Sequence, residues 1–318
     1  MDQGRTKDFA HMFAANTSIL MEGALSERLK REYRLKFDEH IAMANLIDAA
    51  PGRSALRTLW KQYAAIASRY RLPFLATTPT RRANRERMQR ACRSGELLLQ
   101  NAAFLREIQA QCACEMYIGG LMGCKGDAYT GADALSAEEA FSFHAWQAEW
   151  FQRAGVDFLY AGILPVCSEA IGMARAMEQT GIPYMISFTI QADGNLIDGT
   201  PIDEAIDRID AATTNQPVCY MTNCVHPRIV RQALLQPFNQ TDRVRHRFGG
   251  VQANTSPLPY AQLDHAPKLY TSPPEELAEE MLRLREILPL KIFGGCCGTD
   301  ARHMEAIARR LSESVEMR

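Results

Sequence analysis

The sequence has no long hydrophobic run and no excess of charge of either sign. No apolar stretch approaches the roughly 20 residues of a membrane-spanning helix, and the N-terminal residues lack the apolar segment of a secretory signal. Lys and Arg number 36 against 37 Asp and Glu, which gives no electrostatic basis for binding nucleic acid or an anionic membrane. We therefore expect a cytoplasmic protein without a nucleic-acid or membrane partner.

The sequence also lacks a disulfide framework and two common ligand-binding motifs. Its nine cysteines are an odd number without regular spacing, which favours free thiols in a reducing compartment. No CxxC pair of the kind found in closed structural zinc sites is present. No glycine-rich phosphate-binding turn follows an early apolar run, which disfavours a dinucleotide-binding open sheet.

Eight short apolar runs, rich in β-branched and aromatic residues, recur along the chain. We predict that they are strands over residues 17–21, 72–78, 116–122, 158–164, 184–190, 218–224, 249–254 and 292–296. Amphipathic stretches between them are typical of helices. Strands alternating with helices, eight in number, predict one α/β domain over residues 1–318, a (β/α)8 TIM barrel. An open, doubly wound sheet is the alternative.

Residues 26–70 are longer than one barrel helix needs. This segment is basic and amphipathic, and a break at residues 50–52, Ala-Pro-Gly, predicts two extra helices outside the barrel after the first strand. Later helix boundaries carry capping signals. Ser136 with Glu139 three residues later predicts a capping box, and Gly155 predicts a helix end.

Three cysteines stand where predicted strands end. Cys296 and Cys297 follow the last apolar run, and Cys224 ends the sixth. Because a barrel brings the C-terminal ends of its strands to one mouth, the three thiols are predicted to meet there. Three thiolates leave one coordination position of a Zn2+ ion open, as in catalytic sites, and such a site suits alkyl transfer to a thiol. The alternatives are ordinary packing residues or a vicinal disulfide.

The motif around these cysteines also resembles a known family. Residues 294–299, Gly-Gly-Cys-Cys-Gly-Thr, together with the Asn-Cys pair at 223–224, are similar to the zinc-binding signature of the homocysteine S-methyltransferase family. Residues 119–131 and 154–159 resemble its third-strand and fourth-strand regions. The resemblance covers most of the chain. It implies a (β/α)8 barrel in which the three cysteines hold zinc and the sulfur of homocysteine takes the open position.

The resemblance implies that the reaction is methyl transfer to a small-molecule thiol, with homocysteine giving methionine. A cobalamin-binding domain does not fit beside a barrel in 318 residues, so we expect a diffusible onium donor: S-adenosylmethionine, S-methylmethionine or a betaine. Such a donor departs as a neutral molecule, so no general acid is needed. The oligomeric state is left open, a homo-oligomer included.

The predicted substrate-binding residues depart in part from the family pattern. Glu22 stands where the family typically has Asp, and Gly162 lies where it usually has a Glu that binds the amino acid. We predict that Glu22, Asn223 and Asn254 contact substrate. The alternative is a zinc-holding barrel of the same family with a different acceptor thiol, or with a binding role and no methyl transfer.

Other polar residues near predicted strand ends receive plainer interpretations. Tyr129, in a glycine-flanked loop, is interpreted as a packing residue, with closure over the site as the alternative. His226, before a proline that starts a helix, is expected to point into solvent, with metal coordination by its imidazole as the alternative. His303, in the last helix, is expected at the surface. Three arginines at 81, 82 and 85 form a basic cluster that either meets a carboxylate of a substrate or lies on a solvated helix face.

Overall fold

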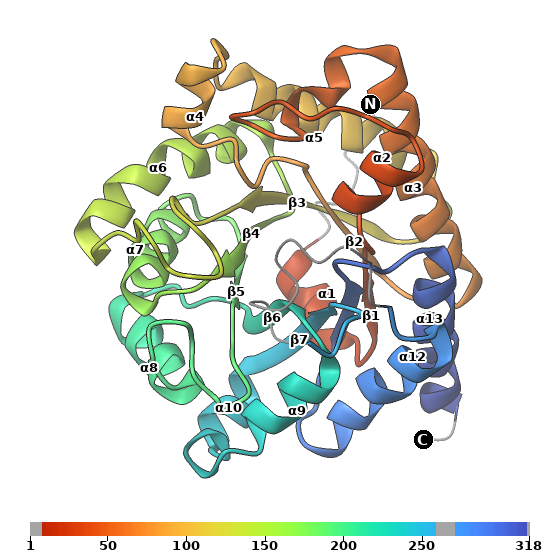
Figure 1. The fold of residues 1–318 in the computed structure, drawn as a ribbon, viewed down its shortest axis with the longest axis vertical. Coiled ribbons are helices and arrows are strands. Elements are labelled where there is room, and N and C mark those ends of the chain that lie inside the picture. The colour runs from red at the N-terminus through yellow and green to blue at the C-terminus, as the bar shows by residue number, and fades with distance from the viewer. Residues whose placement is uncertain (1–7, 259–270, 317–318) are drawn as a thin grey trace.

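Eight parallel strands form a closed barrel at the centre of the molecule (Figure 1). In this computed structural model, residues 8–258 and 271–316 are described. The strands are β1 (Ile19–Met21), β2 (Phe74–Thr77), β3 (Met116–Met122), β4 (Phe158–Leu164), β5 (Tyr184–Phe188), β6 (Cys219–Val225), β7 (Phe248–Ala253) and β8 (Ile292–Gly295). Each pairs with its neighbours in chain order, and β1 pairs with β8 to close the ring. The predicted single-domain (β/α)8 barrel and its eight strands are confirmed.

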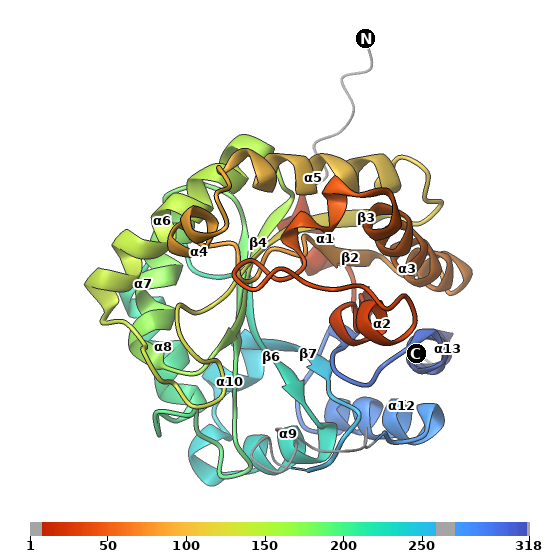
Figure 2. The same ribbon diagram turned by 45° about the horizontal axis from the view of Figure 1, so that its top comes forward.

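Helices surround the barrel, and Figure 2 shows this ring from a tilted view. They are α1 (Phe9–Ala15), α2 (Ser26–Arg31), α3 (Ala50–Arg69), α4 (Arg85–Arg90), α5 (Glu96–Gln109), α6 (Ala137–Ala154), α7 (Cys167–Glu178), α8 (Ile202–Ala212), α9 (Pro227–Leu234), α10 (Asp242–Arg247), α12 (Pro274–Arg283) and α13 (Ala301–Glu316). Short 3-10 helices are η1 (Ala44–Asp48), η2 (Pro237–Asn239) and η3 (Leu284–Glu286). None of the helices in the described ranges is long and apolar enough to span a bilayer.

The extra helices after the first strand are present, and a break lies at the extended Ala49, just before the predicted residues 50–52. Residues 50–52 begin the 20-residue helix α3 rather than separate two helices. Pro51 lies in the first turn of α3, where its missing N–H would have no intrahelical partner anyway. A longer interruption comes earlier, in the irregular residues 32–43 between α2 and η1.

The capping signals act as predicted. The Ser136 hydroxyl accepts from the Glu139 N–H, and the Glu139 carboxylate accepts from the Ser136 N–H at 3.0 Å, so the capping box opens α6. Gly155 ends α6 with a φ of 62°, in the left-handed region where a side chain would be strained. These local signals fix both ends of the helix that packs closely against α7.

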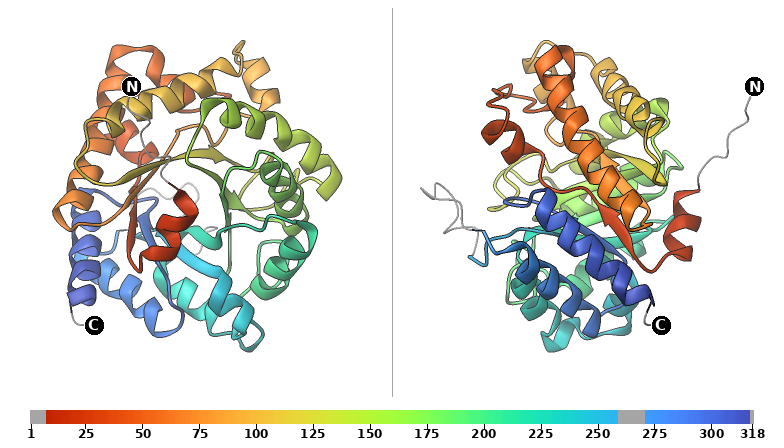
Figure 3. Two further views of the ribbon diagram at one scale, coloured as in Figure 1. Left: turned by 180° about the vertical axis from the view of Figure 1, so that it is seen from behind. Right: turned by 90° about the vertical axis from the view of Figure 1, so that its right-hand side faces the viewer.

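Helix α1, which the sequence analysis did not predict, closes the N-terminal end of the barrel. Seen from behind in Figure 3 (left), it lies across that opening, and the right panel places it at the end opposite to α2. The Phe9 ring stacks on Phe158 with centroids 4.5 Å apart and meets Tyr117 edge-on at 5.9 Å. Phe9 and Met12 join the apolar side chains inside the barrel. The floor is therefore sealed, and access is from the mouth at the C-terminal strand ends.

Candidate metal centre and substrate site

Cys224 reaches the mouth through a distortion of β6. Its φ is 64°, a left-handed conformation that costs free energy for a residue other than glycine. The register of β6 against β7 shifts between Asn223 and Val225, so Cys224 lies on a bulge. Bulges re-aim side chains at barrel rims. Here the bulge turns the Cys224 sulfur toward the end of β8.

Cys296 and Cys297 lie in the turn that follows β8, and hydrogen bonds fix this turn. The Cys296 N–H donates to Ala253 O at 2.7 Å, and the Thr299 hydroxyl donates to Cys296 O at 2.7 Å. Thr255 N–H donates to Cys297 O at 3.1 Å. A Cβ at Gly295 would lie 2.3 Å from Thr299 Oγ1, so this tight turn requires glycine there.

The three cysteine sulfurs converge on one point. All lie within 4.8 Å of one another, and the Cys224 and Cys297 sulfurs are 3.3 Å apart. A Zn–S bond of about 2.3 Å in a tetrahedron separates two sulfurs by about 3.8 Å, which this spacing brackets. All three thiols are free in this structure. Three soft donors at this separation fit a metal ion.

The thiols compete for negative charge. Hydrogen bonds from Cys296 and Cys297 lower the pKa of Cys224 well below its usual value. The hydrogen bond to Cys224 in turn raises the pKa of Cys296 and of Cys297 well above theirs. A single thiolate is therefore favoured in the protein alone, whereas a bound divalent cation would stabilise all three.

Two further side chains contact Cys224. Asn254, just beyond β7, directs its Nδ2 at the Cys224 sulfur at 3.8 Å, and its Oδ1 accepts from Ser256 N at 2.9 Å. The hydroxyl of Tyr129 hydrogen-bonds the same sulfur. Tyr129 packs against the hydrophobic core, as interpreted, and its hydroxyl also reaches the cysteine cluster.

A cavity of about 740 Å³ opens beside Cys224. Its lining includes Tyr129, Thr189, Ile190 and His226. This volume is within the range of small-molecule sites, about 300 to 1,000 Å³. A ligand in the cavity would face the cysteine cluster directly.

Glu22 lies at the mouth end of β1 and is buried. One carboxylate oxygen accepts from the N–H and hydroxyl of Thr77, at 3.1 and 2.5 Å, and the other accepts from Trp60 Nε1 at 2.6 Å. Burial raises the pKa of Glu22 to about 7, against the lowering effect of these hydrogen bonds. Glu22 is therefore not a solvated surface carboxylate, and it is partly ionised at neutral pH.

Asn223 belongs to a polar network inside the barrel. Its Oδ1 accepts from the Ser187 hydroxyl at 2.6 Å. Nearby, the Tyr160 hydroxyl donates to Gln252 Oε1 at 2.8 Å. Sequence reasoning missed Tyr160 and Gln252, although both are polar side chains within predicted buried strands, which was the available signal.

The Leu121 side chain occupies the space next to Gly162, where the resemblance would place a carboxylate. A Cβ at this position would lie 2.6 Å from Leu121 Cδ1 and 3.6 Å from Tyr160 Cε1. The adjoining Ile163 has a φ of 64°, and the pairing of β4 with β5 is irregular between Ala161 and Leu164. Leu121 fills the space instead.

The two histidines near the cysteines are buried, so the expectation that they point into solvent is wrong. His226 is the N-cap of α9, as Pro227 indicated, but its ring turns inward toward the hydroxyl of Ser272 at 3.3 Å. His303 Nε2 lies 3.0 Å from the carbonyl oxygen of Ser272. Ser272 thus links the start of α9 to α13.

Comparisons with known proteins agree with this architecture. A family model described as homocysteine S-methyltransferase matches residues 19–311. Methionine synthases of Mycobacterium leprae and Mycobacterium tuberculosis are 26% and 25% identical over 154 residues, a segment that spans 46% of this chain and only 12% of each relative. The homocysteine methyltransferase MmuM from Escherichia coli superposes in its metallated and oxidised forms with TM-scores of 0.73 and 0.74. These matches are 19% and 20% identical and cover 94% and 93% of this chain and 98% and 97% of the solved chains.

Proposed function

Because the chain belongs to the homocysteine S-methyltransferase family, we propose that it is a zinc-dependent enzyme that transfers a methyl group from an onium donor to homocysteine, giving methionine. The observation that supports this best is the convergence of three free thiols within 4.8 Å of one another at the barrel mouth. We propose a cytoplasmic location for this enzyme, because free thiols persist in reducing compartments.

Cys224, Cys296 and Cys297 hold the zinc ion in this proposal. A zinc ion with three thiolate ligands lowers the pKa of an incoming thiol at its open position and leaves that sulfur nucleophilic. The hydrogen bonds that fix the turn after β8, and the bulge at Cys224, hold the three sulfurs before any ligand arrives. Asn254 and Tyr129 orient the Cys224 sulfur.

Glu22 binds the ammonium group of homocysteine in this proposal. Its carboxylate is fixed by Thr77 and Trp60, and a nearby ammonium would favour its ionised form. Asn223, next to Cys224 in β6, contacts the remainder of the acceptor in this proposal. The acceptor loses its thiol proton to solvent on binding.

The transfer is an in-line displacement. The sulfur lone pair of the acceptor forms the new carbon–sulfur bond, and the bond from the methyl carbon to the onium atom breaks with its electron pair on the donor. The donor leaves neutral, so no residue has to supply a proton. The cavity beside Cys224 holds the donor, for which S-adenosylmethionine, S-methylmethionine and a betaine are the candidates.

A second function is favoured by the wall at Gly162. Leu121 fills the space in which a second carboxylate would bind an ammonium group, and Glu22 is only partly ionised at neutral pH. An acceptor thiol without an ammonium group would suit this wall better than homocysteine. A zinc-holding barrel that binds such a thiol without methyl transfer is the limiting case.

The test is product detection by mass spectrometry. The zinc-loaded protein is incubated with L-homocysteine and each donor in turn, and then with mercaptocarboxylates that lack an ammonium group. Methionine formed by the wild type, and absent with Cys224→Ser, supports the proposal. Methylated mercaptocarboxylate without methionine supports the second function. Bound zinc with no methylated product from any pair would refute both enzymatic readings.

A further inference from the structure

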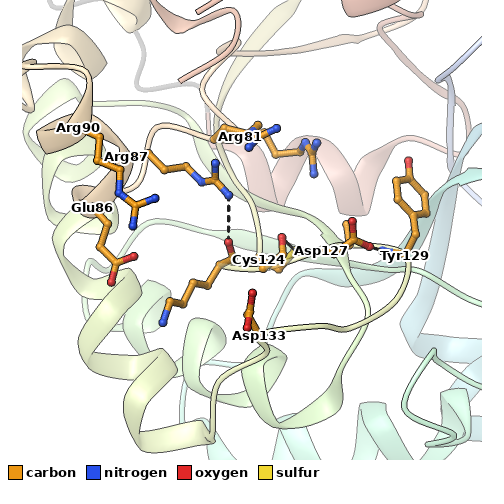
Figure 4. A pocket seen from close by; sticks show the side chains of 12 residues that line it. Arg81, Glu86, Arg87, Arg90, Cys124, Asp127, Tyr129 and Asp133 are labelled. Carbon is orange, nitrogen blue, oxygen red and sulfur yellow. Dashed lines mark hydrogen bonds between the residues drawn. The ribbon is translucent and has the colours of Figure 1, made fainter. Parts of the chain in front are cut away.

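A second cavity, of about 730 Å³, lies between the loop after β2 and the loop after β3 (Figure 4). Five cationic side chains line it: Arg81, Arg82, Arg87, Arg90 and Lys125. We call it the arginine cavity. Three carboxylates also line it, so its lining carries a surplus of positive charge although the whole chain is nearly neutral.

The cations of the arginine cavity are not neutralised by ion pairs. Within residues 8–258 and 271–316, none of the five has a carboxylate oxygen within 4.0 Å. Arg93, three residues beyond Arg90, does form such a pair, with Asp48 at 2.6 Å. Asp127 lines the cavity, but its Oδ1 accepts from the N–H groups of Tyr129 and Thr130.

Hydrogen bonds and close packing fix the two loops that form the walls of the arginine cavity. Lys125 N–H donates to Glu169 Oε1 at 2.7 Å, and the same buried oxygen lies 3.0 Å from His144 Nε2. A Cβ at Gly123 would lie 2.6 Å from Arg81 Cγ, so the glycine lets Arg81 pack against the loop. Arg87 Nη2 lies 3.4 Å from Lys125 O, which joins the two walls (Figure 4).

The arginines repel one another across the cavity. Burial lowers the pKa of Arg87, and the charges of Arg82, Arg90 and Arg81 lower it further. A bound anion would relieve both effects, because opposite charge favours the ionised guanidinium. Arginines present fixed, paired donors that match carboxylate and phosphate oxygens.

The arginine cavity adjoins the metal centre. Tyr129 lines it and also lines the cavity beside Cys224, whose sulfur its hydroxyl contacts. Figure 4 shows Tyr129 at one end of the cavity, with Arg87 and Arg90 toward the other. A ligand in the arginine cavity would therefore meet the same tyrosine that orients the metal centre.

We propose that the arginine cavity binds a small-molecule anion with at least two carboxylate or phosphate groups. The anion is either the acidic part of a methyl-transfer substrate or a separate effector, and only this link to turnover rests on the proposed function. A betaine or S-methylmethionine carries one carboxylate and would leave most of the cations without a partner. The cavity thus indicates a more acidic ligand than the simplest donors.

The first test is calorimetric titration of the zinc-loaded protein with inorganic pyrophosphate, citrate and acetate. We expect pyrophosphate or citrate to bind and acetate to bind far more weakly. Arg87→Gln should raise the dissociation constant about tenfold or more, as loss of one charge-assisted contact does. Arg85→Gln, an exposed arginine on the same helix outside the lining, should change it less than twofold. Absence of binding, or equal affinities of the two variants, would overturn the proposal.

The second test locates the anion in the reaction. If Arg87→Gln raises the KM of one methyl-transfer substrate about tenfold at constant kcat, the anion is part of that substrate. If both KM values are unchanged but pyrophosphate alters wild-type turnover, the anion is an effector. Anion binding without methyl transfer would support the proposed anion site and contradict the proposed function. Methyl transfer without anion binding would support the proposed function and contradict the anion site.

Discussion

The two ends of the barrel are built from different kinds of residue. At the floor, aromatic and aliphatic side chains from α1 and the strands form a buried cluster, and Phe9 is 1% exposed. At the mouth, Cys224 and Ile163 adopt left-handed conformations, and buried Glu22 has a pKa of about 7. The floor stabilises the fold, whereas the strained and buried polar residues at the mouth lower the stability of the fold and place reactive groups. This separation lets the chemistry of a barrel change without loss of its fold.

The largest effect is expected at the mouth. Cys296→Ser removes one of three proposed metal ligands, so zinc content should fall below stoichiometric and methyl transfer by about three orders of magnitude or more. Metal analysis after dialysis and a product assay measure both. Cys92→Ser, at an exposed cysteine, is the matched control and should behave as wild type. Retention of zinc and turnover in Cys296→Ser would contradict the assignment of the ligands.

At the floor, a substitution is expected to lower stability and to leave substrate binding unchanged. Phe9→Ala removes a buried ring that contacts Tyr117 and Phe158, which should lower the free energy of unfolding by about 3 to 5 kcal/mol. Urea denaturation measures this change. The KM for each substrate should stay within twofold. Phe238→Ala, at a phenylalanine that is 44% exposed, should cost under about 0.5 kcal/mol. A raised KM in Phe9→Ala would show that the two ends are coupled.

Glu22 tests the claim that the mouth costs stability. The pKa of Glu22 is raised from 4.5 to about 7. Its contribution to the free energy of unfolding is therefore fully present below pH 4.5 and is lost as the pH rises through 7. The loss amounts to about 3 kcal/mol.

The comparison needs the zinc-free protein at pH 4.5 and pH 8. The difference in unfolding free energy between wild type and Glu22→Gln should change by about 3 kcal/mol, in favour of the variant at pH 8. Glu149→Gln, on the exposed face of α6, should show no such change. A pH-independent difference for Glu22→Gln would rule out a raised pKa.

The smallest effect concerns a mouth residue with a purely structural role. Ser136→Ala removes the capping box of α6 and should cost about 1 kcal/mol of stability without changing kcat. Ser142→Ala, in the middle of the same helix, should be neutral or slightly stabilising. Thermal denaturation of both variants checks this. Equal melting temperatures of the Ser136→Ala and Ser142→Ala variants would show that Ser136 does not stabilise the mouth.

The sequence predicted the barrel because its signals are local. Strands of a parallel sheet are buried on both faces and appear as apolar runs, and caps such as Ser136 mark helix ends. Helix α1 escaped notice because seven residues with two buried side chains give too little periodicity. The break predicted at residues 50–52 falls within the start of α3, since a proline marks either the end of one helix or the first turn of another.

The site was predictable where one motif carried it and not where distant residues meet. The cysteines could be placed from strand ends alone. The hydrogen bond from Trp60 to Glu22 joins positions 38 apart on different elements, and no local pattern announces it. His226 was correctly placed at a helix start, but its direction depends on Ser272, 46 residues further along.

The seam between β1 and β8 also sets an order of events during synthesis. Ile19 pairs with Ile292, so a growing chain carries an open sheet edge until its last strand emerges from the ribosome. Cys296 and Cys297 follow that same strand, 72 and 73 positions after Cys224. A nascent chain therefore offers one of the three thiols until the moment it can close its barrel. If the three thiols bind a metal as proposed, the complete ligand set exists only after the last strand has been synthesised.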